Sequence, residues 1–324
     1  MIYNFGLDSP AFTEFVKILS DRQCDYEVIR RDKIVVRLFG QVDDSLRQHL
    51  DRISERPGKL VIKHEGEAPR SEEMNLSGKK MIIAGPCAIE SEEQIDEIAR
   101  FLSHLGIRYL RGGAFKPRTN CESFQGLGRT GLRLMADTAA RHGMKVVTEM
   151  MDRSQLDDVA EHADIIQVGS RNMFNYSLLT ALGAVDKPVL LKRGMAATID
   201  EWVHAADYIR RGGNENIILC ERGIRTFEPR TRFTLDILAI PLAKRLTGLP
   251  VIADVSHAAG DRSLVPPLIR AALAGGADGI MVEVHPDPDQ ALSDGRQSLT
   301  LEGFETLYHE LADARLLERS AGMP

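Results

Sequence analysis

Six basic side chains stand at or just after short β-type runs in the second part of the sequence. They are Arg111, Lys116, Arg118, Arg171, Lys192 and Arg222. Cations gathered in one place repel one another unless anionic ligands bind between them. Arginine holds phosphate or carboxylate through two parallel hydrogen bonds, whereas lysine acts as a point charge. The set therefore predicts a site for anions, with room for more than one phosphate.

A second group at the same strand ends combines one soft sulfur, one imidazole and two carboxylates. Its members are Cys87, His257, Glu283 and Asp294. This donor set suits a divalent transition metal such as Mn, Fe, Co or Zn, whereas Mg and Ca prefer oxygen ligands alone. A cysteine by itself is more often a small buried apolar residue than a ligand. The four residue types together at strand ends nevertheless favour a metal site.

These residues need a scaffold that gathers the ends of many strands. From residue 80 onward, helical stretches alternate with short β-type runs at 81–84, 107–110, 145–149, 164–168, 188–192, 216–220, 250–254 and 279–283. Eight strand–helix units predict a (β/α)8 TIM barrel. A doubly wound parallel sheet is the alternative, because a strand count does not prove closure. A closed barrel would bring the residues at the strand ends, Glu149 and Asp254 included, to one mouth.

The beginning of the chain has a different pattern, typical of a small α+β module. Short β-rich runs at 2–5, 25–30, 33–39 and 59–63 are interrupted by helical stretches at 9–22 and 43–54. This β–α–β–β–α–β order is that of a ferredoxin-like domain. The polar segment that follows, with Pro and Gly, predicts a linker. The expected organisation is a ferredoxin-like domain over 1–70, a linker over 71–79 and the barrel over 80–324.

Composition excludes several classes of protein. The chain has 324 residues, of which 43% are hydrophobic and 27% charged, so it can bury a large core. The formal net charge of −6 argues against a nucleic-acid-binding protein. We expect no membrane association and no secretory signal, because the sequence lacks a long apolar run and a basic N-terminal region. Four cysteines without a CxxC pair are typical of a reduced compartment, which predicts a cytoplasmic protein.

Eight segments, in the same order along the chain, resemble 3-deoxy-7-phosphoheptulonate (DAHP) synthase of the short type Iβ branch. They are GPCAIES (85–91), RGGAFKPRT (111–119), QVGSRNM (167–173), LLKRGM (190–195), ERGIRTFE (221–228), DVSHAAG (254–260), MVEVHP (281–286) and ALSDGRQSL (291–299). The resemblance implies a (β/α)8 barrel and a metal-dependent, aldol-type condensation. Phosphoenolpyruvate, erythrose 4-phosphate and water would give the seven-carbon product and phosphate, the first step of the shikimate pathway.

The resemblance also implies a role for each candidate residue. The metal ligands would be Cys87, His257, Glu283 and Asp294, and phosphoenolpyruvate would be held by Arg111, Lys116, the backbone of Ser170, Arg171, Lys192 and Arg222. Arg118 and Thr119 would bind the phosphate of erythrose 4-phosphate, and Asp254 would belong to the substrate site. Lys116 would stabilise or protonate the developing alkoxide. Glu149 and His257 are the candidates for activating the water.

Some positions depart from the family's pattern, and some alternatives stay open. Asn120-Cys121, Val255 and Phe233 stand where Ser-Pro, Pro and Asn are usual. The related KDO8P synthase, which uses arabinose 5-phosphate, is one alternative, although it usually carries an Ala-Asn-Arg-Ser type segment in place of residues 116–119. A catalytically silent, metal-binding regulatory homologue is another.

The resemblance leaves the N-terminal module with two interpretations. It would bind tyrosine or phenylalanine as an inhibitor, or it is a passive cap or oligomerisation surface. A homotetramer or homodimer is expected for the assembly.

Overall fold

The computed structural model describes residues 2–5, 9–24, 26–30, 34–38, 44–53, 80–116 and 122–317. The chain divides into two compact units, Met1–Glu67 and Ala68–Pro324. Each unit has a hydrophobic core of its own, and each is described by itself below.

The first unit is a three-stranded sheet with two helices in its described part. Its elements are β1 (Ile2–Phe5), α1 (Pro10–Asp21), β2 (Tyr26–Arg30), β3 (Ile34–Leu38) and α2 (Asp44–Ile53). Strand β3 lies between β1 and β2 and is antiparallel to both, so α1 joins two parallel strands that are separated by a third. The predicted strand at 59–63 and the predicted linker at 71–79 lie outside the described residues.

Aromatic side chains form the centre of this unit. Tyr3, Phe5 and Phe15 are buried, and the Phe15 ring lies 4.6 Å from the ring of Tyr3 and 4.9 Å from that of Phe5. Leu19 of α1 and Leu50 of α2 are fully buried beside them. The apolar faces of both helices thus meet one core.

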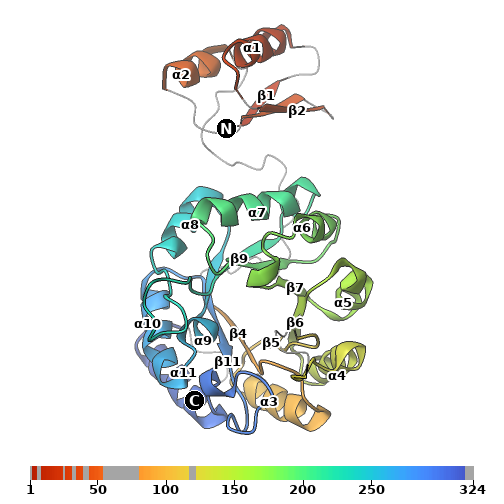
Figure 1. Ribbon diagram of the computed structural model, residues 1–324, viewed down its shortest axis with the longest axis vertical. Helices are drawn as coiled ribbons and strands as arrows, with labels where there is room; N and C mark the ends of the chain where they lie inside the picture. The colour runs from red at the N-terminus through yellow and green to blue at the C-terminus, as the bar shows by residue number, and fades with distance from the viewer. Residues whose placement is uncertain are drawn as a thin grey trace. The chain divides into compact units, whose positions relative to one another are not determined.

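The second unit is a closed barrel of eight parallel strands (Figure 1). The strands are β4 (Met81–Gly85), β5 (Tyr109–Arg111), β6 (Lys145–Met150), β7 (Ile165–Val168), β8 (Val189–Lys192), β9 (Ile217–Glu221), β10 (Val251–Asp254) and β11 (Gly279–Glu283). Pairing of β11 with β4 and of β9 with β10 completes the ring. The predicted (β/α)8 barrel is confirmed, and the doubly wound sheet is wrong.

Helices surround the barrel and alternate with its strands (Figure 1). They are α3 (Glu92–His104), α4 (Gly128–Arg141), α5 (Leu156–His162), α6 (Tyr176–Leu182), α7 (Ile199–Arg211), α8 (Ala239–Thr247), α9 (Val255–Ala259), α10 (Val265–Ala274) and α11 (Leu301–Asp313). Helix α7 begins where its sequence predicts, because Thr198 and Glu201 satisfy each other's backbone N–H groups in a capping box. Ser91 caps α3 through Gln94 N–H, but the Gln94 side chain accepts from Glu90 N–H instead of Ser91 N–H.

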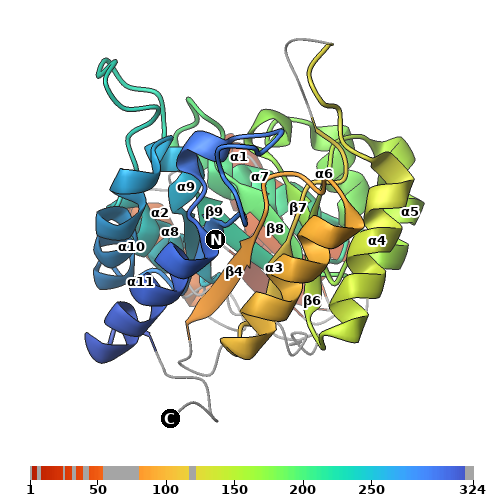
Figure 2. The same cartoon turned by 90° about the horizontal axis from the view of Figure 1, so that it is seen from below.

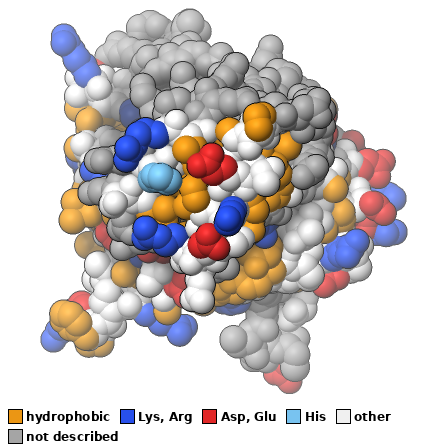
Figure 3. Space-filling model, turned by 90° about the horizontal axis from the view of Figure 1, so that it is seen from above, with side chains coloured by type: hydrophobic (Ala, Val, Ile, Leu, Met, Phe, Trp, Pro, Cys, Tyr) orange, Lys and Arg blue, Asp and Glu red, His pale blue; other side chains and the backbone are white. Residues whose placement is uncertain are grey.

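Two long connections stand at the same end of the barrel. One follows β5 and the other, the teal segment in Figure 2, joins β9 to α8. Active sites of such barrels form at the carboxyl ends of the strands, from the loops that follow them. Within the described residues, no helix is both long and apolar enough to cross a membrane. On the face shown in Figure 3, acidic, basic and apolar side chains are mixed, without a broad basic field.

Candidate active site

The interior of the barrel is built in layers, and the candidate residues form the layer next to its mouth. The apolar layer contains Ile83, Tyr109, Val147, Ile165, Leu190, Cys220, Ile252 and Met281. Side chains along a strand alternate between two faces, so the residue two positions later also points inward. Those residues are Gly85, Arg111, Glu149, Gln167, Lys192, Arg222, Asp254 and Glu283. On seven of the eight strands, the next inward-pointing residue after the apolar layer is therefore polar or charged.

Four potential metal ligands come together at one side of this layer. One ligand atom each from Cys87, His257, Glu283 and Asp294 lies within 4.8 Å of all the others. Cys87 Sγ lies 3.1 Å from Asp294 Oδ2, and His257 Nε2 lies 3.4 Å from Glu283 Oε1. Metal bonds of about 2.0 to 2.3 Å hold ligands within about 4.6 Å of one another. The four atoms therefore fit a single transition-metal ion after shifts of a few tenths of an ångström.

The surroundings of Cys87 and His257 affect their readiness to bind a metal in opposite directions. Burial, followed by the negative charge of Glu283, raises the pKa of the Cys87 thiol to about 12. The Lys116 ammonium lies 3.0 Å from Cys87 Sγ, and its charge favours the thiolate that metal binding requires. Burial also lowers the pKa of His257, so its imidazole is neutral and able to coordinate near pH 7.

Asp254 lies beneath the site and orients two of its side chains. Its carboxylate is fully buried and lies 2.5 Å from Lys192 Nζ and 2.8 Å from His257 Nδ1. Burial alone would raise the pKa of Asp254, but its contacts with His257 and Lys192 outweigh burial and lower the pKa well below its usual value. Asp254 does not line the pocket. The side chain holds Lys192 and the His257 ring in place, and its place in the substrate site stays a prediction.

Arg111 and Glu283 form a second buried pair. Arg111 Nη1 lies 2.6 Å from Glu283 Oε1, and Gln297 Nε2 donates to Glu283 Oε2 at 2.5 Å. Arg111 Nε is buried without a hydrogen-bond partner. Like Asp254, Arg111 is absent from the pocket lining, so its nearest role in this structure is to fix the Glu283 carboxylate.

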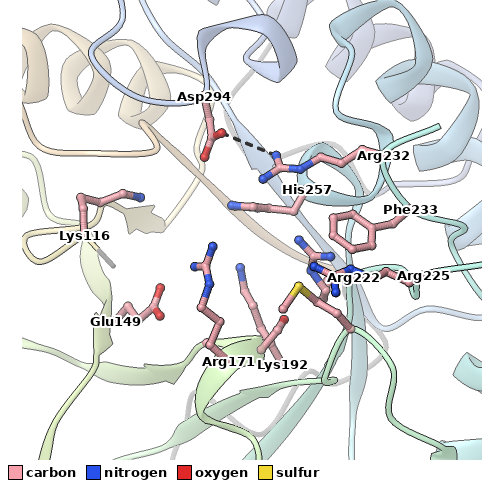
Figure 4. Close-up of a pocket in the computed structure, with 13 residues that line it drawn as sticks. Lys116, Glu149, Arg171, Lys192, Arg222, Arg225, Arg232, Phe233, His257 and Asp294 are labelled. Carbon is pink, nitrogen blue, oxygen red and sulfur yellow. Dashed lines mark ion pairs between the residues drawn. The ribbon is translucent and has the colours of Figure 1, made fainter. Parts of the chain in front are cut away.

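A pocket of about 320 Å³ opens beside the metal ligands, and Figure 4 shows side chains from many strand ends pointing into it. Its lining includes the six cations Lys116, Arg171, Lys192, Arg222, Arg225 and Arg232. Among the described residues, the acidic side chains of the lining are Glu149 and Asp294, and His257 also reaches it. Such an excess of positive charge attracts anionic ligands.

Glu149 is held at the opposite side of the pocket. Gln167 Nε2 donates to Glu149 Oε2 at 3.0 Å. A Cβ at Gly169 would lie 2.0 Å from Glu149 Oε1, so a larger residue here would displace the carboxylate from this position. Ser170 and Arg171 follow this glycine and also line the pocket.

The structure gathers most of the predicted site residues. Arg118 and Thr119 lie outside the described residues. Met195, Arg225, Arg232 and Phe233 line the pocket without having been predicted to contact substrate. Arg225 and Arg232 belong to the long β9–α8 connection, where no strand periodicity marks the direction of a side chain. The sequence could have indicated these two arginines only through their positive charge, since other basic residues of the predicted site lie nearby.

Comparison with known proteins points in one direction. The DAHP synthetase I family matches residues 64–317. The phospho-2-dehydro-3-deoxyheptonate aldolase of Thermotoga maritima is 55% identical over 241 residues, covering 74% of this chain and 71% of that protein. The 2-dehydro-3-deoxyphosphooctonate aldolase of Desulfatibacillum aliphaticivorans is 34% identical over 260 residues, covering 75% of this chain and 94% of that protein.

Solved structures agree. A crystal structure of the Thermotoga maritima DAHP synthase has a TM-score of 0.73 and 42% identity, and the match covers 98% of both chains. A truncated form of that organism's 3-deoxy-D-arabino-heptulosonate 7-phosphate synthase has a TM-score of 0.68 and 52% identity, covering 74% of this chain and 89% of that one.

Proposed function

The chain belongs to the DAHP synthetase I family and is an enzyme of that family. We propose that the residues of its cationic pocket and its metal site together condense phosphoenolpyruvate with erythrose 4-phosphate. The observation that carries the proposal is that a potential metal site lies next to a pocket for anions. The quartet Cys87, His257, Glu283 and Asp294 borders a pocket lined by six cations. A reaction between two phosphorylated substrates at a divalent metal needs both features.

Phosphoenolpyruvate is bound by the inner cations of the pocket. Lys192 and Arg222 are 4% and 5% exposed, so they face the ligand in a poorly hydrated environment where charge attraction is strong. Arg171 and the backbone of Ser170 close the same side. Two arginines and one lysine together satisfy a phosphate and a carboxylate. Erythrose 4-phosphate then lies toward Lys116 and the residues that follow it, with Arg118 and Thr119 as the expected phosphate anchors.

Rigid anchoring is the main catalytic contribution of these cations. Carbon 3 of phosphoenolpyruvate is a weak nucleophile, and it must meet the aldehyde carbon at contact distance. When bound, the metal supplies a Lewis acid for the aldehyde oxygen. Lys116, whose ammonium contacts Cys87 Sγ at 3.0 Å, donates a proton or a hydrogen bond to the alkoxide that develops there.

Water addition at carbon 2, followed by loss of phosphate, completes the reaction. Glu149 is the stronger candidate to take the proton of this water, because its Oε2 is fixed by Gln167 and the carboxylate faces the pocket. His257 is the second candidate, but both of its ring nitrogens already lie near carboxylates, with Nδ1 toward Asp254 and Nε2 toward Glu283.

Phosphoenolpyruvate consumption tests the substrate assignment. Manganese-loaded protein should consume it with erythrose 4-phosphate and not with arabinose 5-phosphate, and EDTA should abolish the reaction. Consumption with arabinose 5-phosphate alone would transfer the assignment to the phosphooctonate branch, whose relatives are about 34% identical against 55% for the heptonate enzyme.

The N-terminal unit we assign to regulation. Its separate core and its β1–β3–β2 sheet support a small domain that binds an aromatic amino acid, tyrosine or phenylalanine, as an inhibitor. A homotetramer or homodimer and a cytoplasmic location accompany this proposal. The latter rests on cysteines that carry no disulfide among the described residues.

A further inference from the structure

An aromatic ring stands among the cations of the pocket. The Phe233 ring lines the pocket, and the guanidinium carbon of Arg222 lies over it at 4.0 Å from the ring centroid. The guanidinium carbon of Arg232 lies 5.8 Å from the same centroid. Figure 4 shows the ring between these two arginines. A cation at 4.0 Å over an aromatic face is within the range of a cation–π interaction.

In the described part of the chain, the Phe233 ring is the contact partner of the Arg222 guanidinium. Among the described residues no carboxylate pairs with Arg222, and its Nη1 is buried without a hydrogen-bond partner. Arg111 and Arg193, which lie outside the pocket lining, are in contrast held by Glu283 and Glu221. Without a carboxylate to orient it, the buried guanidinium relies on its contact with the Phe233 ring, and its unused donor is available to an anion.

The protein fixes Phe233 from three directions. Phe233 N–H donates to Ala258 O at 3.2 Å, just after His257. Ile224 and Thr234 exchange two backbone hydrogen bonds of 2.9 Å. A Cβ at Gly223, where φ is +87°, would lie 2.7 Å from Phe233 Cβ, so this glycine makes room for the ring.

Arg232 is meanwhile directed elsewhere. Its Nη1 lies 3.5 Å from Asp294 Oδ1 and donates to Gln297 Oε1. Two guanidinium groups in one pocket repel each other, and an aromatic ring between them separates the charges while attracting both. The ring therefore keeps Arg232 beside Asp294 and leaves Arg222 to face an anionic ligand in the pocket.

We propose that Phe233 is a positioning residue for phosphoenolpyruvate, because its ring holds the Arg222 guanidinium over its face and aims the free edge at the anionic substrate. This inference rests on the proposed function. Phe233 itself makes no polar contact with substrate. The ring restricts the Arg222 side chain before substrate binds, so that binding costs less conformational entropy. It also keeps Arg232 out of the same subsite.

Phe233→Leu tests this role, because leucine keeps the apolar bulk and removes the aromatic face. We expect the KM for phosphoenolpyruvate to rise roughly three- to thirty-fold, the range of a buried cation–π contact. The KM for erythrose 4-phosphate and kcat should change less than about twofold, since only substrate binding is affected. Phe233→Tyr keeps the face and should restore the wild-type KM. Phe227→Leu is the matched control, because Phe227 belongs to the same connection and is 99% exposed.

Arg222→Lys supplies a second test that does not depend on Phe233→Leu alone. Lysine has no planar group to stack, so adding Phe233→Leu to Arg222→Lys should weaken phosphoenolpyruvate binding by less than about twofold. Binding of phosphoenolpyruvate without sugar, measured calorimetrically on manganese-loaded protein, reports the same effect independently of turnover.

Three results would overturn the proposal: an unchanged KM in Phe233→Leu, an equal loss in both KM values and kcat, or a Phe233→Tyr variant as defective as Phe233→Leu. An undiminished effect of Phe233→Leu on phosphoenolpyruvate binding in the Arg222→Lys background would also contradict it. Failure of the proposed function is distinguishable, because wild-type protein would then consume no phosphoenolpyruvate with erythrose 4-phosphate.

Discussion

At the scale of single residues, the site follows from side-chain alternation within strands. Arg111, Glu149, Lys192 and Glu283 each come two positions after a residue of the inner apolar layer. Their inward direction was therefore predictable from strand phase alone. Their partners were not predictable. Nothing in the sequence indicates that Asp254 pairs with Lys192 and His257 while Glu283 pairs with Arg111. Pairing depends on which strand ends the closed barrel places side by side.

Asp254→Asn tests the assignment of Asp254 as a buried support. Asparagine keeps the shape but leaves the Lys192 ammonium without its carboxylate, which lies at 2.5 Å in a side-chain pair no more than 5% exposed. We expect a loss of about 3 kcal/mol in the free energy of unfolding, the range for a broken buried ion pair. Metal affinity should also fall about 10- to 100-fold, because the His257 ring loses its orienting partner.

Urea denaturation and equilibrium dialysis measure the two effects. Glu310→Gln is the control, because the Arg270–Glu310 pair is 43% and 55% exposed and its loss should cost less than about 1 kcal/mol. An Asp254→Asn protein as stable as the control would contradict the assignment.

At the scale of elements, strands and helices were predictable within a few residues, and loops were not. Strand β11 covers the predicted 279–283, and β10 lies within the predicted 250–254. Both are short runs of mainly apolar, buried residues. The β9–α8 connection contributes Arg225, Arg232 and Phe233 to the pocket. The Ile224–Thr234 bridge and the contact with α9 set the direction of its side chains. A periodic pattern of apolar residues in the sequence does not reveal such contacts.

The turn after β7 carries a prediction at this scale. In Gly169→Ala the new Cβ would collide with Glu149 Oε1 and push the carboxylate from its place beside Gln167. We expect kcat to fall at least about tenfold, as for loss of a positioned general base, while the protein stays folded. Steady-state kinetics and thermal melting measure this.

Gly143→Ala provides the contrast. Its φ is +64° and its surroundings are open, so alanine should cost about 1 kcal/mol of stability and leave kcat unchanged. If Gly169→Ala behaved in the same way as Gly143→Ala, Glu149 would have no catalytic role that depends on its position.

At the scale of the whole molecule, the change from β–α–β–β order to strict strand–helix alternation predicted two units. The structure gives each of them a core. What the N-terminal unit binds is not readable from its sequence, because its pattern of apolar residues specifies packing and carries no distinctive polar motif. Its role as an effector domain therefore stays a prediction.

Removal of residues 1–67 tests that role. The barrel has its own closed sheet and core, so the shortened chain should fold and stay active. Tyrosine or phenylalanine should inhibit the full chain and not the truncated one. Equal inhibition of both forms would place the effector site on the barrel, and no inhibition of either would leave the unit without a regulatory role.

The central claim is that one metal ion, held by Cys87, His257, Glu283 and Asp294, enables condensation in the adjoining cationic pocket. The most direct measurement adds manganese stepwise to chelator-treated protein and records bound metal and phosphoenolpyruvate consumption in the same samples. We predict that the rate rises in proportion to bound manganese up to one ion per chain. Cys87→Ser should bind manganese at least about tenfold more weakly, while Cys24→Ser should match the wild type. A rate that does not follow bound manganese, or a Cys87→Ser protein that binds the ion as the wild type does, would contradict the claim.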